Sequence, residues 1–232
     1  MDELPEVDGG WEVLDVDVGA ADPVRLWAPR EPDRLLDDEQ VVERSQFNDS
    51  MPYWAWLWDS GPTMARLLAR ESIGGQAAVL ELGAGLGLAG IAAAVLGGPG
   101  VDLVLTDHDP LSLAALPVNA RRNGIEARVW DLDWRHLGEA PEGRFDLILG
   151  CDVAYEAKLQ EPLLDVVDRY LAPGGVALFA DPGRTRLLGF VRRATARGYR
   201  VELEDAEGSP AELEAAAFRL VRLRRESAAG AG

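Results

Sequence analysis

The chain has 232 residues, of which 47% are hydrophobic and 27% are charged, and its formal net charge is −17. A chain of this length can bury a large core without disulfides or a structural metal, and its negative charge disfavours nucleic acids and anionic membranes as partners. The single cysteine excludes an internal disulfide and fits a reducing compartment, so we predict a cytoplasmic protein.

Metal ligands and membrane signals are both scarce. His108, His136 and Cys151 are the only histidines and cysteine, and zinc sites usually need three or four such ligands, so we predict no metal centre. The acidic start Met1–Glu6 lacks the basic region of a signal peptide. The longest apolar run, Ala84–Gly98, is shorter than a membrane span, which predicts a soluble protein.

The first 50 residues differ in pattern from the rest. The apolar stretches Trp11–Val18 and Val24–Trp27 flank Gly19–Pro23, which predicts a β-hairpin. Residues 30–50 are charged and rich in turn formers. We predict an N-terminal extension over residues 1–50, packed on a main domain at 51–225 that is followed by a frayed tail at 226–232.

From residue 77 onward, strand and helix patterns alternate regularly. Predicted helices begin at Asp59 or Ser60, after Gly87, at Asp109, near Leu159 and near Leu187, and Pro117 is expected to kink or interrupt the third. The predicted strands are Ala77–Leu82, Asp102–Thr106, Ala127–Trp130, Phe145–Gly150, Val176–Ala180, Tyr199–Leu203 and Phe218–Leu223. This order predicts an α/β fold: a doubly wound, mostly parallel, seven-stranded Rossmann-like sheet with helices on both faces.

A glycine-rich turn follows the first of these strands. Glycines between Glu81 and Gly87 permit positive φ and let a ligand approach the backbone closely. Asp107, at the end of the next strand, could accept hydrogen bonds from ribose hydroxyls. Together they indicate a nucleoside-bearing cofactor, and Gly85–Gly90 also matches the dinucleotide pattern G-x-G-x-x-G. An NAD enzyme, however, usually needs a second substrate domain, and no room for one follows the fifth strand.

These motifs carry a family resemblance. With E-x-G-x-G-x-G at residues 81–87, an acidic end to the second strand and Pro-Gly-Gly at 173–175, residues 77–224 resemble the class I, seven-strand, S-adenosylmethionine-dependent methyltransferases. The resemblance implies S-adenosylmethionine as cofactor. It also implies that Glu81, Gly83, Ala84 and Gly85 surround the methionine end, and that Asp107 binds the ribose.

A narrower resemblance follows from three further segments. Trp58-Asp59, the sequence Leu-Asp-Trp at 132–134 and Asp-Val-Ala-Tyr at 152–155 are similar to the DxxY branch (family 16) of protein-lysine methyltransferases. In that branch the positions of Trp58, Trp134 and Cys151 line the cofactor pocket. Residues 52–58 and 181–184 are similar to the subgroup acting on the electron-transfer-flavoprotein β-subunit, although Asp-Ser-Gly stands at 59–61 where that subgroup has Pro-Gly-Gly.

Asp152 and Tyr155 are the predicted catalytic residues. Methyl transfer is a direct displacement, so an enzyme must align the nucleophile with the methyl carbon, and a lysine must first lose a proton. Asp152 could orient the ammonium and then the neutral amine. Tyr155, three residues on, would point the same way on a helical turn, and its ring could contact a cation. The alternatives are a helix N-cap for Asp152 and core packing for Tyr155.

The prediction is therefore an S-adenosylmethionine-dependent methyltransferase that modifies a lysine side chain of a protein. Two alternatives stay open: a methyltransferase acting on a small amine or hydroxyl compound, and a cofactor-binding scaffold without turnover. A protein substrate predicts an open cleft beside Asp152 and Tyr155. A small substrate predicts a lid, most plausibly formed by residues 30–58.

Overall fold

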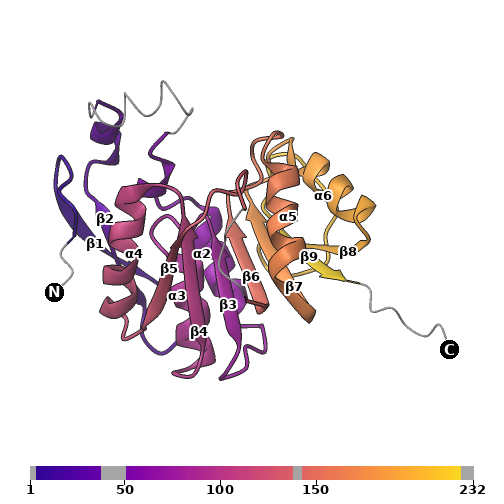
Figure 1. Ribbon diagram of the computed structural model, residues 1–232, viewed down its shortest axis with the longest axis horizontal. Coiled ribbons are helices and arrows are strands. Elements are labelled where there is room, and N and C mark those ends of the chain that lie inside the picture. Colours follow the sequence, from indigo (N-terminus) through magenta and orange to yellow (C-terminus); the bar gives the residue numbers. More distant parts are fainter. Residues whose placement is uncertain (1–3, 38–50, 138–142, 226–232) are drawn as a thin grey trace.

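The computed structural model describes residues 4–37, 51–137 and 143–225. Its main feature is a seven-stranded sheet with strand order β5-β4-β3-β6-β7-β9-β8 (Figure 1). β9 is antiparallel to both of its neighbours, and the other pairs are parallel. The strands are β3 (Ala78–Leu82), β4 (Asp102–Asp107), β5 (Ala127–Asp131), β6 (Phe145–Cys151), β7 (Leu171–Asp181), β8 (Tyr199–Glu204) and β9 (Arg219–Arg225). The mostly parallel sheet predicted from the sequence is confirmed.

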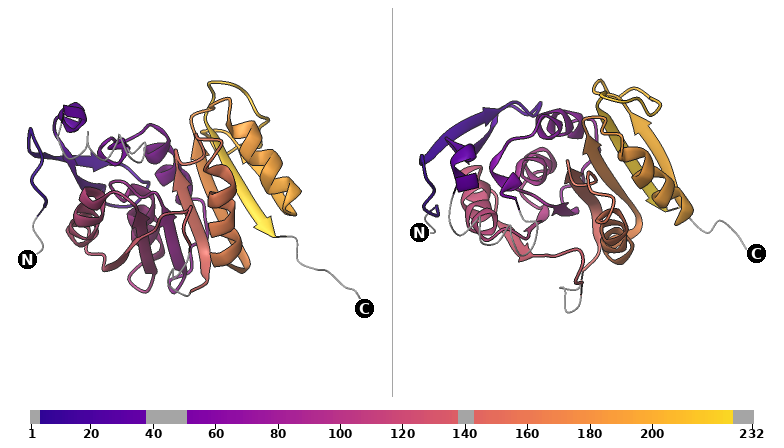
Figure 2. Two further views of the ribbon diagram at one scale, coloured as in Figure 1. Left: turned by 45° about the horizontal axis from the view of Figure 1, so that its top comes forward. Right: turned by 90° about the horizontal axis from the view of Figure 1, so that it is seen from above.

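Helices cover both faces of this sheet (Figure 2). On one face lie α2 (Ser60–Leu68), α3 (Leu88–Gly97) and α4 (Pro110–Arg122), and on the other lie α5 (Gln160–Tyr170) and α6 (Leu187–Ala196). Successive strand residues alternate between the two cores, as Val79 and Leu80 do, because side chains of a strand point alternately to opposite faces. Both faces are thus apolar, which explains the nearly continuous hydrophobic strands.

The starts of α2 and α4 differ in how they are capped. The Asp109 side chain accepts a hydrogen bond from the Leu111 N–H at 2.8 Å, with Pro110 as the first helical residue, so this predicted N-cap is confirmed. α2 begins at the predicted place, but the Asp59 side chain makes no capping hydrogen bond. The predicted interruption at Pro117 is wrong, since α4 runs through this residue to Arg122.

The Pro-Gly-Gly sequence at 173–175 lies inside a strand, although the predicted strand begins only after it, at Val176. β7 starts at Leu171, directly after α5, and includes residues 173–175. The pairing of β6 with β7 shifts there, from Phe145↔Leu171 to Leu147↔Val176, so the turn residues form an irregularity in the ladder rather than a loop before it. Such extra residues bend a strand locally.

The predicted N-terminal hairpin consists of β1 (Trp11–Val16) and β2 (Val24–Pro29), followed by a short 3-10 helix, η1 (Pro32–Asp37). Two asparagines of α4 hold β2 by its backbone. The Asn123 side chain exchanges two hydrogen bonds with the main chain of Arg25, both of 2.8 Å. The Asn119 side chain does the same with Trp27, at 2.7 and 3.1 Å.

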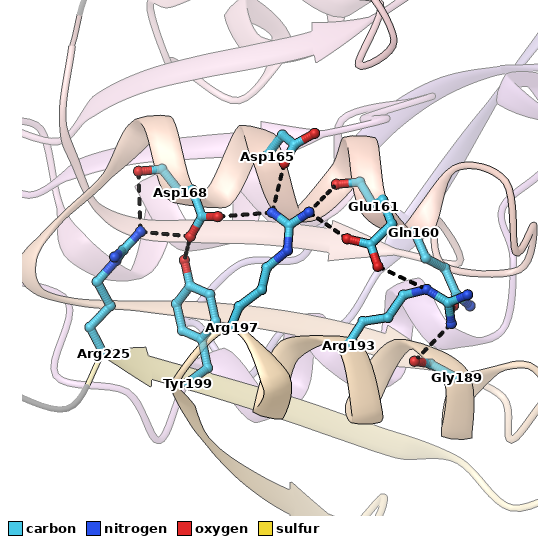
Figure 3. A network of polar contacts seen from close by, with 9 residues as sticks. All are labelled: Gln160, Glu161, Asp165, Asp168, Gly189, Arg193, Arg197, Tyr199 and Arg225. Atoms are coloured by element: carbon cyan, nitrogen blue, oxygen red, sulfur yellow. Dashed lines mark hydrogen bonds and ion pairs between the residues drawn. The ribbon is translucent and has the colours of Figure 1, made fainter.

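A set of ion pairs joins α5, α6 and the last two strands, and we call it the helix network (Figure 3). Arg197 pairs with Asp165 at 2.7 Å and with Asp168 at 2.8 Å, and it also binds Glu161. Arg193 pairs with Glu161 at 3.1 Å. Asp168 further accepts hydrogen bonds from Tyr199 and Arg225. The network fixes α6 and the sheet edge to α5.

The proposed division into extension, main domain and tail rests on sequence pattern alone. Residues 38–50 of the extension and the predicted tail at 226–232 lie outside the described residues, as do 138–142. In the described part of the chain, no helix is both long and apolar enough to cross a membrane. The same residues include no group of three or more His, Cys, Asp or Glu side chains placed to hold a metal.

Candidate active site

A cleft of about 470 Å³ opens at the carboxyl ends of β3 and β6. The strand order reverses between these two strands, and ligands of open α/β sheets bind at such a position. The volume is in the range of small-molecule sites. Ten residues singled out from the sequence all line this cleft: Trp58, Glu81, Gly83, Ala84, Gly85, Asp107, Trp134, Cys151, Asp152 and Tyr155.

The glycine turn from β3 to α3 forms the floor of the cleft. Gly83 and Gly85 have φ values of 62° and 55°, which side-chain-bearing residues rarely adopt. A Cβ atom on Gly83 would lie 2.8 Å from the Val153 side chain, and one on Gly85 would lie 3.1 Å from the carbonyl oxygen of Trp54. Both positions therefore need glycine for backbone shape and for close packing, whatever else they bind.

The Asp107 carboxylate is fixed by the turns around it. Its Oδ2 accepts a hydrogen bond from the Gly85 N–H at 2.8 Å, and its Oδ1 accepts from the N–H groups of His108 and Asp109 at 2.7 and 3.0 Å. A carboxylate offers about four lone-pair positions. Asp107 therefore keeps capacity for about one further donor, which suits one ribose hydroxyl better than two.

Glu81, near the end of β3, is buried with its carboxyl group against the first turn of α3. Its Oε2 accepts a hydrogen bond from the Gly90 N–H at 2.8 Å, and a Cβ on Gly90 would lie only 2.7 Å from that oxygen. Burial raises the pKa of Glu81 to about 8, with the backbone N–H groups of Gly90 and Ala89 opposing the shift. The carboxyl is thus mostly protonated near neutral pH until a cation comes close.

Aromatic rings form one wall of the cleft. Residues 53–55 form a 3-10 turn, η2 (Tyr53–Ala55), so the three tryptophans do not share the face that an extended segment would give them. Trp54 is buried against Trp11, while Trp56 and Trp58 pack together with ring centroids 6.3 Å apart. The Tyr53 ring meets Trp58 and also Tyr155, at 5.9 and 6.0 Å.

Trp134 stands on the opposite side of the glycine turn. Its indole ring would come within 3.2 Å of a Cβ placed on Gly83, so it covers the floor of the cleft directly. Next to it, Asp133 holds Arg135 by an ion pair of 2.8 Å and His136 by a contact of 3.0 Å. These pairs anchor the short loop after β5. They do not involve the Trp134 ring, which stays available to a flat ligand group.

Asp152 lies at the end of β6 in an unusual conformation. Its φ is +59°, in the left-handed region where aspartate and asparagine are the non-glycine residues best tolerated. Its side chain is 7% exposed, and Oδ1 forms an ion pair with Nη1 of Arg184. Burial raises the pKa of this carboxyl; Arg184 and, to a smaller degree, the nearby Ser60 hydroxyl oppose the rise. Within the described residues, Oδ2 has no hydrogen-bond partner.

Two local expectations for this loop are wrong. α5 begins only at Gln160, so Asp152 is not a helix N-cap, and residues 152–155 do not form a helical turn. Tyr155 nevertheless reaches the same place. The Arg184 guanidinium carbon lies 5.7 Å from the centre of the Tyr155 ring, and desolvation raises the pKa of Tyr155 to about 12, so its hydroxyl stays protonated.

Cys151 is part of the cleft wall rather than a nucleophile. Its Sγ lies 3.0 Å from Sδ of Met64, and burial raises the pKa of the thiol well above its usual value. A protonated, enclosed thiol is inert. His108 also lines the cleft; its side chain is half exposed and contacts Asp131 at 3.0 Å.

Sequence reasoning missed three residues that build the site. Arg184 and Tyr53 belong to segments noted only for their family resemblance. Gln160, at the start of α5, is 1% exposed; its Nε2 donates to the Ala154 carbonyl at 2.8 Å and to the Arg186 carbonyl at 3.0 Å. It thus ties the loop of Asp152 to the loop of Arg184. In the sequence Gln160 is one polar residue at the start of a predicted helix, and nothing there signals that it is buried.

Comparison with known proteins agrees with this geometry. A family model described as lysine methyltransferase matches residues 45–187, more than half of the chain. The chain is 32% identical over 142 residues to the electron transfer flavoprotein beta subunit lysine methyltransferase of Rattus norvegicus, covering 60% of this chain and 54% of that protein. It is 29% identical over 163 residues to the EEF1A lysine methyltransferase 3 of Mus musculus, covering 68% of each. The chain thus spans about half the length of the flavoprotein methyltransferases that it matches.

Solved structures share the fold. A ribosomal protein L11 methylase from Lactobacillus delbrueckii subsp. bulgaricus has a TM-score of 0.56 at 23% identity, covering 72% of this chain and 79% of that chain. A TehB-like SAM-dependent methyltransferase from Corynebacterium glutamicum has a TM-score of 0.55 at 20% identity, covering 85% and 100%. At such identities the likeness shows the Rossmann-like architecture and nothing finer.

Proposed function

The chain belongs to the lysine methyltransferase family, and from that premise we propose that it transfers a methyl group from S-adenosylmethionine to a lysine side chain of a protein. One observation carries the proposal: a single cleft holds a glycine turn with Asp107 on one side and a buried carboxylate, Asp152, beside aromatic rings on the other. The first half suits a nucleoside cofactor, and the second suits a cation.

The glycine side of the cleft fits S-adenosylmethionine. Gly83 and Gly85 leave the backbone bare, Asp107 retains capacity for a ribose hydroxyl, and the Trp134 ring can cover adenine. The Glu81 carboxyl, ionised by a neighbouring cation, would hold the ammonium of the methionine end. When bound, this cofactor supplies a methyl group activated by a positively charged sulfur. These residue roles are part of the proposal.

The other side fits a lysine side chain. Oδ2 of Asp152 can accept a hydrogen bond from an ammonium group, and the Tyr155 and Tyr53 rings, which pack edge to face beside it, form an aromatic wall that suits a cation. The carboxylate is a weaker base than a lysine amine, so Asp152 orients the amine and the proton leaves to solvent. Orientation of the nucleophile is a large source of rate in such displacements.

The mouth of the cleft favours a protein over a small molecule. The Tyr53 and Trp58 side chains at this mouth are 43% and 40% exposed, so the described part of the predicted lid does not close over the site. Residues 38–50 of that segment lie outside the described residues. Both relatives named above carry protein substrates in their names. We extend the proposal to a cytoplasmic protein with no nucleic acid or membrane partner, on the −17 charge and single cysteine.

A labelling experiment tests this function. Radiolabelled S-adenosylmethionine is incubated with the protein and a lysate of cells from which its gene has been deleted, so that target lysines are unmodified. We expect label in the protein fraction, released as methyl-lysine on hydrolysis, and none when Asp152→Asn replaces the wild type.

Two other outcomes would contradict the proposal. Label confined to the small-molecule fraction would indicate a small amine or hydroxyl substrate. Tight binding of S-adenosylhomocysteine by calorimetry, with no label in either fraction, would indicate a binding scaffold.

A further inference from the structure

Two buried carboxylates at the ends of neighbouring strands share one guanidinium, and we call these residues the cleft cluster. Asp152 follows β6 and Asp181 ends β7; their side chains are 7% and 2% exposed. Arg184 Nη1 pairs with Oδ1 of Asp152 and lies 3.5 Å from Oδ2 of Asp181. Two negative groups with one positive group leave a formal charge of −1 in a place poor in water.

The hydrogen bonds of this cluster are incomplete on the side of the cleft. Oδ1 of Asp181 accepts from the N–H groups of Gly183 and Arg184, at 2.8 and 2.6 Å, which fixes the loop. In the described part of the chain, Oδ2 of Asp152 and Oδ2 of Asp181 accept no hydrogen bond, although Oδ2 of Asp181 lies within ion-pair distance of Arg184. Of the two carboxylates, Asp152 lines the cleft. Buried polar atoms normally find partners. The Ser60 hydroxyl, which also has no hydrogen-bond partner among the described residues, lies near enough to lower the pKa of Asp152 to a small degree. A carboxylate oxygen has two lone pairs, so Oδ2 of Asp152 keeps room for a donor that enters by the cleft.

The backbone of the loop that carries Arg184 packs closely against a neighbouring segment. Gly183 has a φ of +91°, and a Cβ there would lie 2.3 Å from the Ala217 nitrogen, so the backbone is held against the segment before β9. The packing fixes the backbone that carries Arg184, and the ion pair with Asp152 holds its guanidinium. A fixed cation beside a buried carboxylate favours its charged form.

On the basis of the proposed function, we propose that Arg184 is a positioning residue, which binds Oδ1 of Asp152 and keeps this carboxylate charged, so that Oδ2 receives the ammonium of the target lysine. Arg184 thus acts through Asp152 and does not compete with the substrate. It makes the carboxylate a usable acceptor at neutral pH despite its burial, the largest cause that raises the pKa of this group.

Other groups around Asp152 also titrate or carry charge. They are Glu81 at the end of β3, Cys151 on β6, Asp181 on β7, and Tyr155, Glu156 and Lys158 in the following loop. The raised pKa values of Cys151 and Tyr155 keep both neutral between pH 6 and 9. Glu81, with a pKa of about 8, changes charge in that range, so the test must cancel its contribution.

The test compares Arg184→Gln with wild type between pH 6 and 9. The substrate is the lysate protein that wild type labels most strongly, at saturating S-adenosylmethionine. The kcat/KM of the variant is divided by that of wild type. This ratio cancels the ionisation of Glu81 and of the target lysine, which both enzymes share. Removing the guanidinium raises the Asp152 pKa further, so the ratio should approach 1 at high pH and fall by about tenfold per pH unit below the new pKa.

Matched variants separate charge from general damage. Arg186→Gln removes the same charge from an exposed side chain of the same loop, and its ratio should stay flat. Arg184→Lys keeps a charge and should restore most of the rate near neutral pH. If Arg184→Gln does not fold, Arg184→Lys still carries the test, since its weaker pairing should give a smaller fall in the same direction.

Two results would overturn the inference: a reduced ratio that is independent of pH, or a ratio above 1 at every pH, which would make Arg184 a competitor of the lysine. Failure of wild type to label any protein would instead overturn the proposed function. A readout without methylation then remains. Because the charged pair exists only when Asp152 is ionised, the Tm difference between wild type and Arg184→Gln should grow as pH rises, and a constant difference would contradict the inference.

Discussion

The cleft cluster and the helix network are both built from arginines and carboxylates, yet they are completed differently. In the helix network three guanidinium groups, of Arg193, Arg197 and Arg225, meet the three carboxylates of Glu161, Asp165 and Asp168 (Figure 3). None of its side-chain atoms is among those buried without a partner in the described part of the chain. In the cleft cluster two carboxylates share one guanidinium, and within the described residues one oxygen of each carboxylate accepts no hydrogen bond.

The difference separates a structural from a functional use of charge. A balanced and saturated network gains nothing from a further ion and serves to join secondary-structure elements. An unbalanced, unsaturated and buried cluster costs free energy in the free protein, and that cost is reduced when a cationic ligand arrives. The predictions below test whether the two groups of residues behave in these two ways, and they run from the largest expected effect to the smallest.

The largest effect is expected from Asp152→Asn. Asparagine keeps the shape of the side chain and tolerates the left-handed backbone, but it removes the charge that receives the ammonium. Methylation should fall by about 10²-fold or more, the usual scale for a positioned acid–base group, while calorimetry should show nearly unchanged affinity for S-adenosylhomocysteine. Loss of cofactor binding with normal turnover at saturation would instead make Asp152 a cofactor ligand.

Gln160→Leu should have the next largest effect, because this side chain links the two regions. Its Nε2 binds the Ala154 and Arg186 carbonyls, and its Oε1 accepts from Arg193 at 3.2 Å. Leaving two buried carbonyls unpaired should lower the free energy of unfolding by about 1–3 kcal/mol or more. The loosened loops should also lower kcat by about tenfold. Urea unfolding and steady-state kinetics measure the two, and an unchanged kcat would remove Gln160 from the site.

A smaller effect is expected on the release of protons when the cofactor product binds. Glu81 has a raised pKa of about 8, so it is mostly protonated at pH 7, and a cationic methionine end beside it would lower that pKa. Binding of S-adenosylhomocysteine should therefore release a fraction of one proton near pH 7, and affinity should increase as pH rises from about 6 to 8. Calorimetry in buffers of different ionisation enthalpy measures the release. Glu81→Gln should release none, and equal release in this variant would show that another group titrates.

The smallest effect is expected from Arg197→Gln in the helix network. Its carboxylate partners are one-third to nearly three-fifths exposed, so solvent screens these pairs and the free energy of unfolding should fall by only about 1 kcal/mol. Methylation should stay within about twofold of wild type. A large loss of activity with a small loss of stability would mean that the network is not purely structural.

Much of this molecule could be predicted from sequence because its signals are local. Apolar stretches between helices predicted all seven strands, and the glycines after β3 with the acid at the end of β4 predicted residues that the structure brings together in one cleft. Asp109 as an N-cap needed only its neighbours Pro110 and Leu111. Each of these inferences uses residues that act within one turn or one strand.

The features that could not be predicted depend on contacts between distant segments. Arg184 meets Asp152 only because β6 and β7 are neighbours in the sheet, which a separation of 32 positions in the sequence does not reveal. Pro117 was expected to kink or interrupt α4, yet the helix runs through it, because tertiary packing can override helix propensity and Leu116 and Asn119 beside it are buried. The Pro-Gly-Gly at 173–175 was expected as a loop, but β6 offers a partner on either side of it, and the strand absorbs it.

The hydrogen bonds from Asn119 and Asn123 to the main chain of β2 affect how the N-terminal hairpin can be changed and what it can pair with. Residues 25 and 27 are two apart on a strand, about 6.8 Å, and Asn119 and Asn123 are four apart on a helix, about 6.0 Å, so the two amides imitate the edge of an adjacent strand. They shield the outer edge of β2 from pairing with another chain. Because these hydrogen bonds involve only the main chain of Arg25 and Trp27, they place no demand on the side chains there, whereas the neighbouring Val24 and Leu26 are buried in the core.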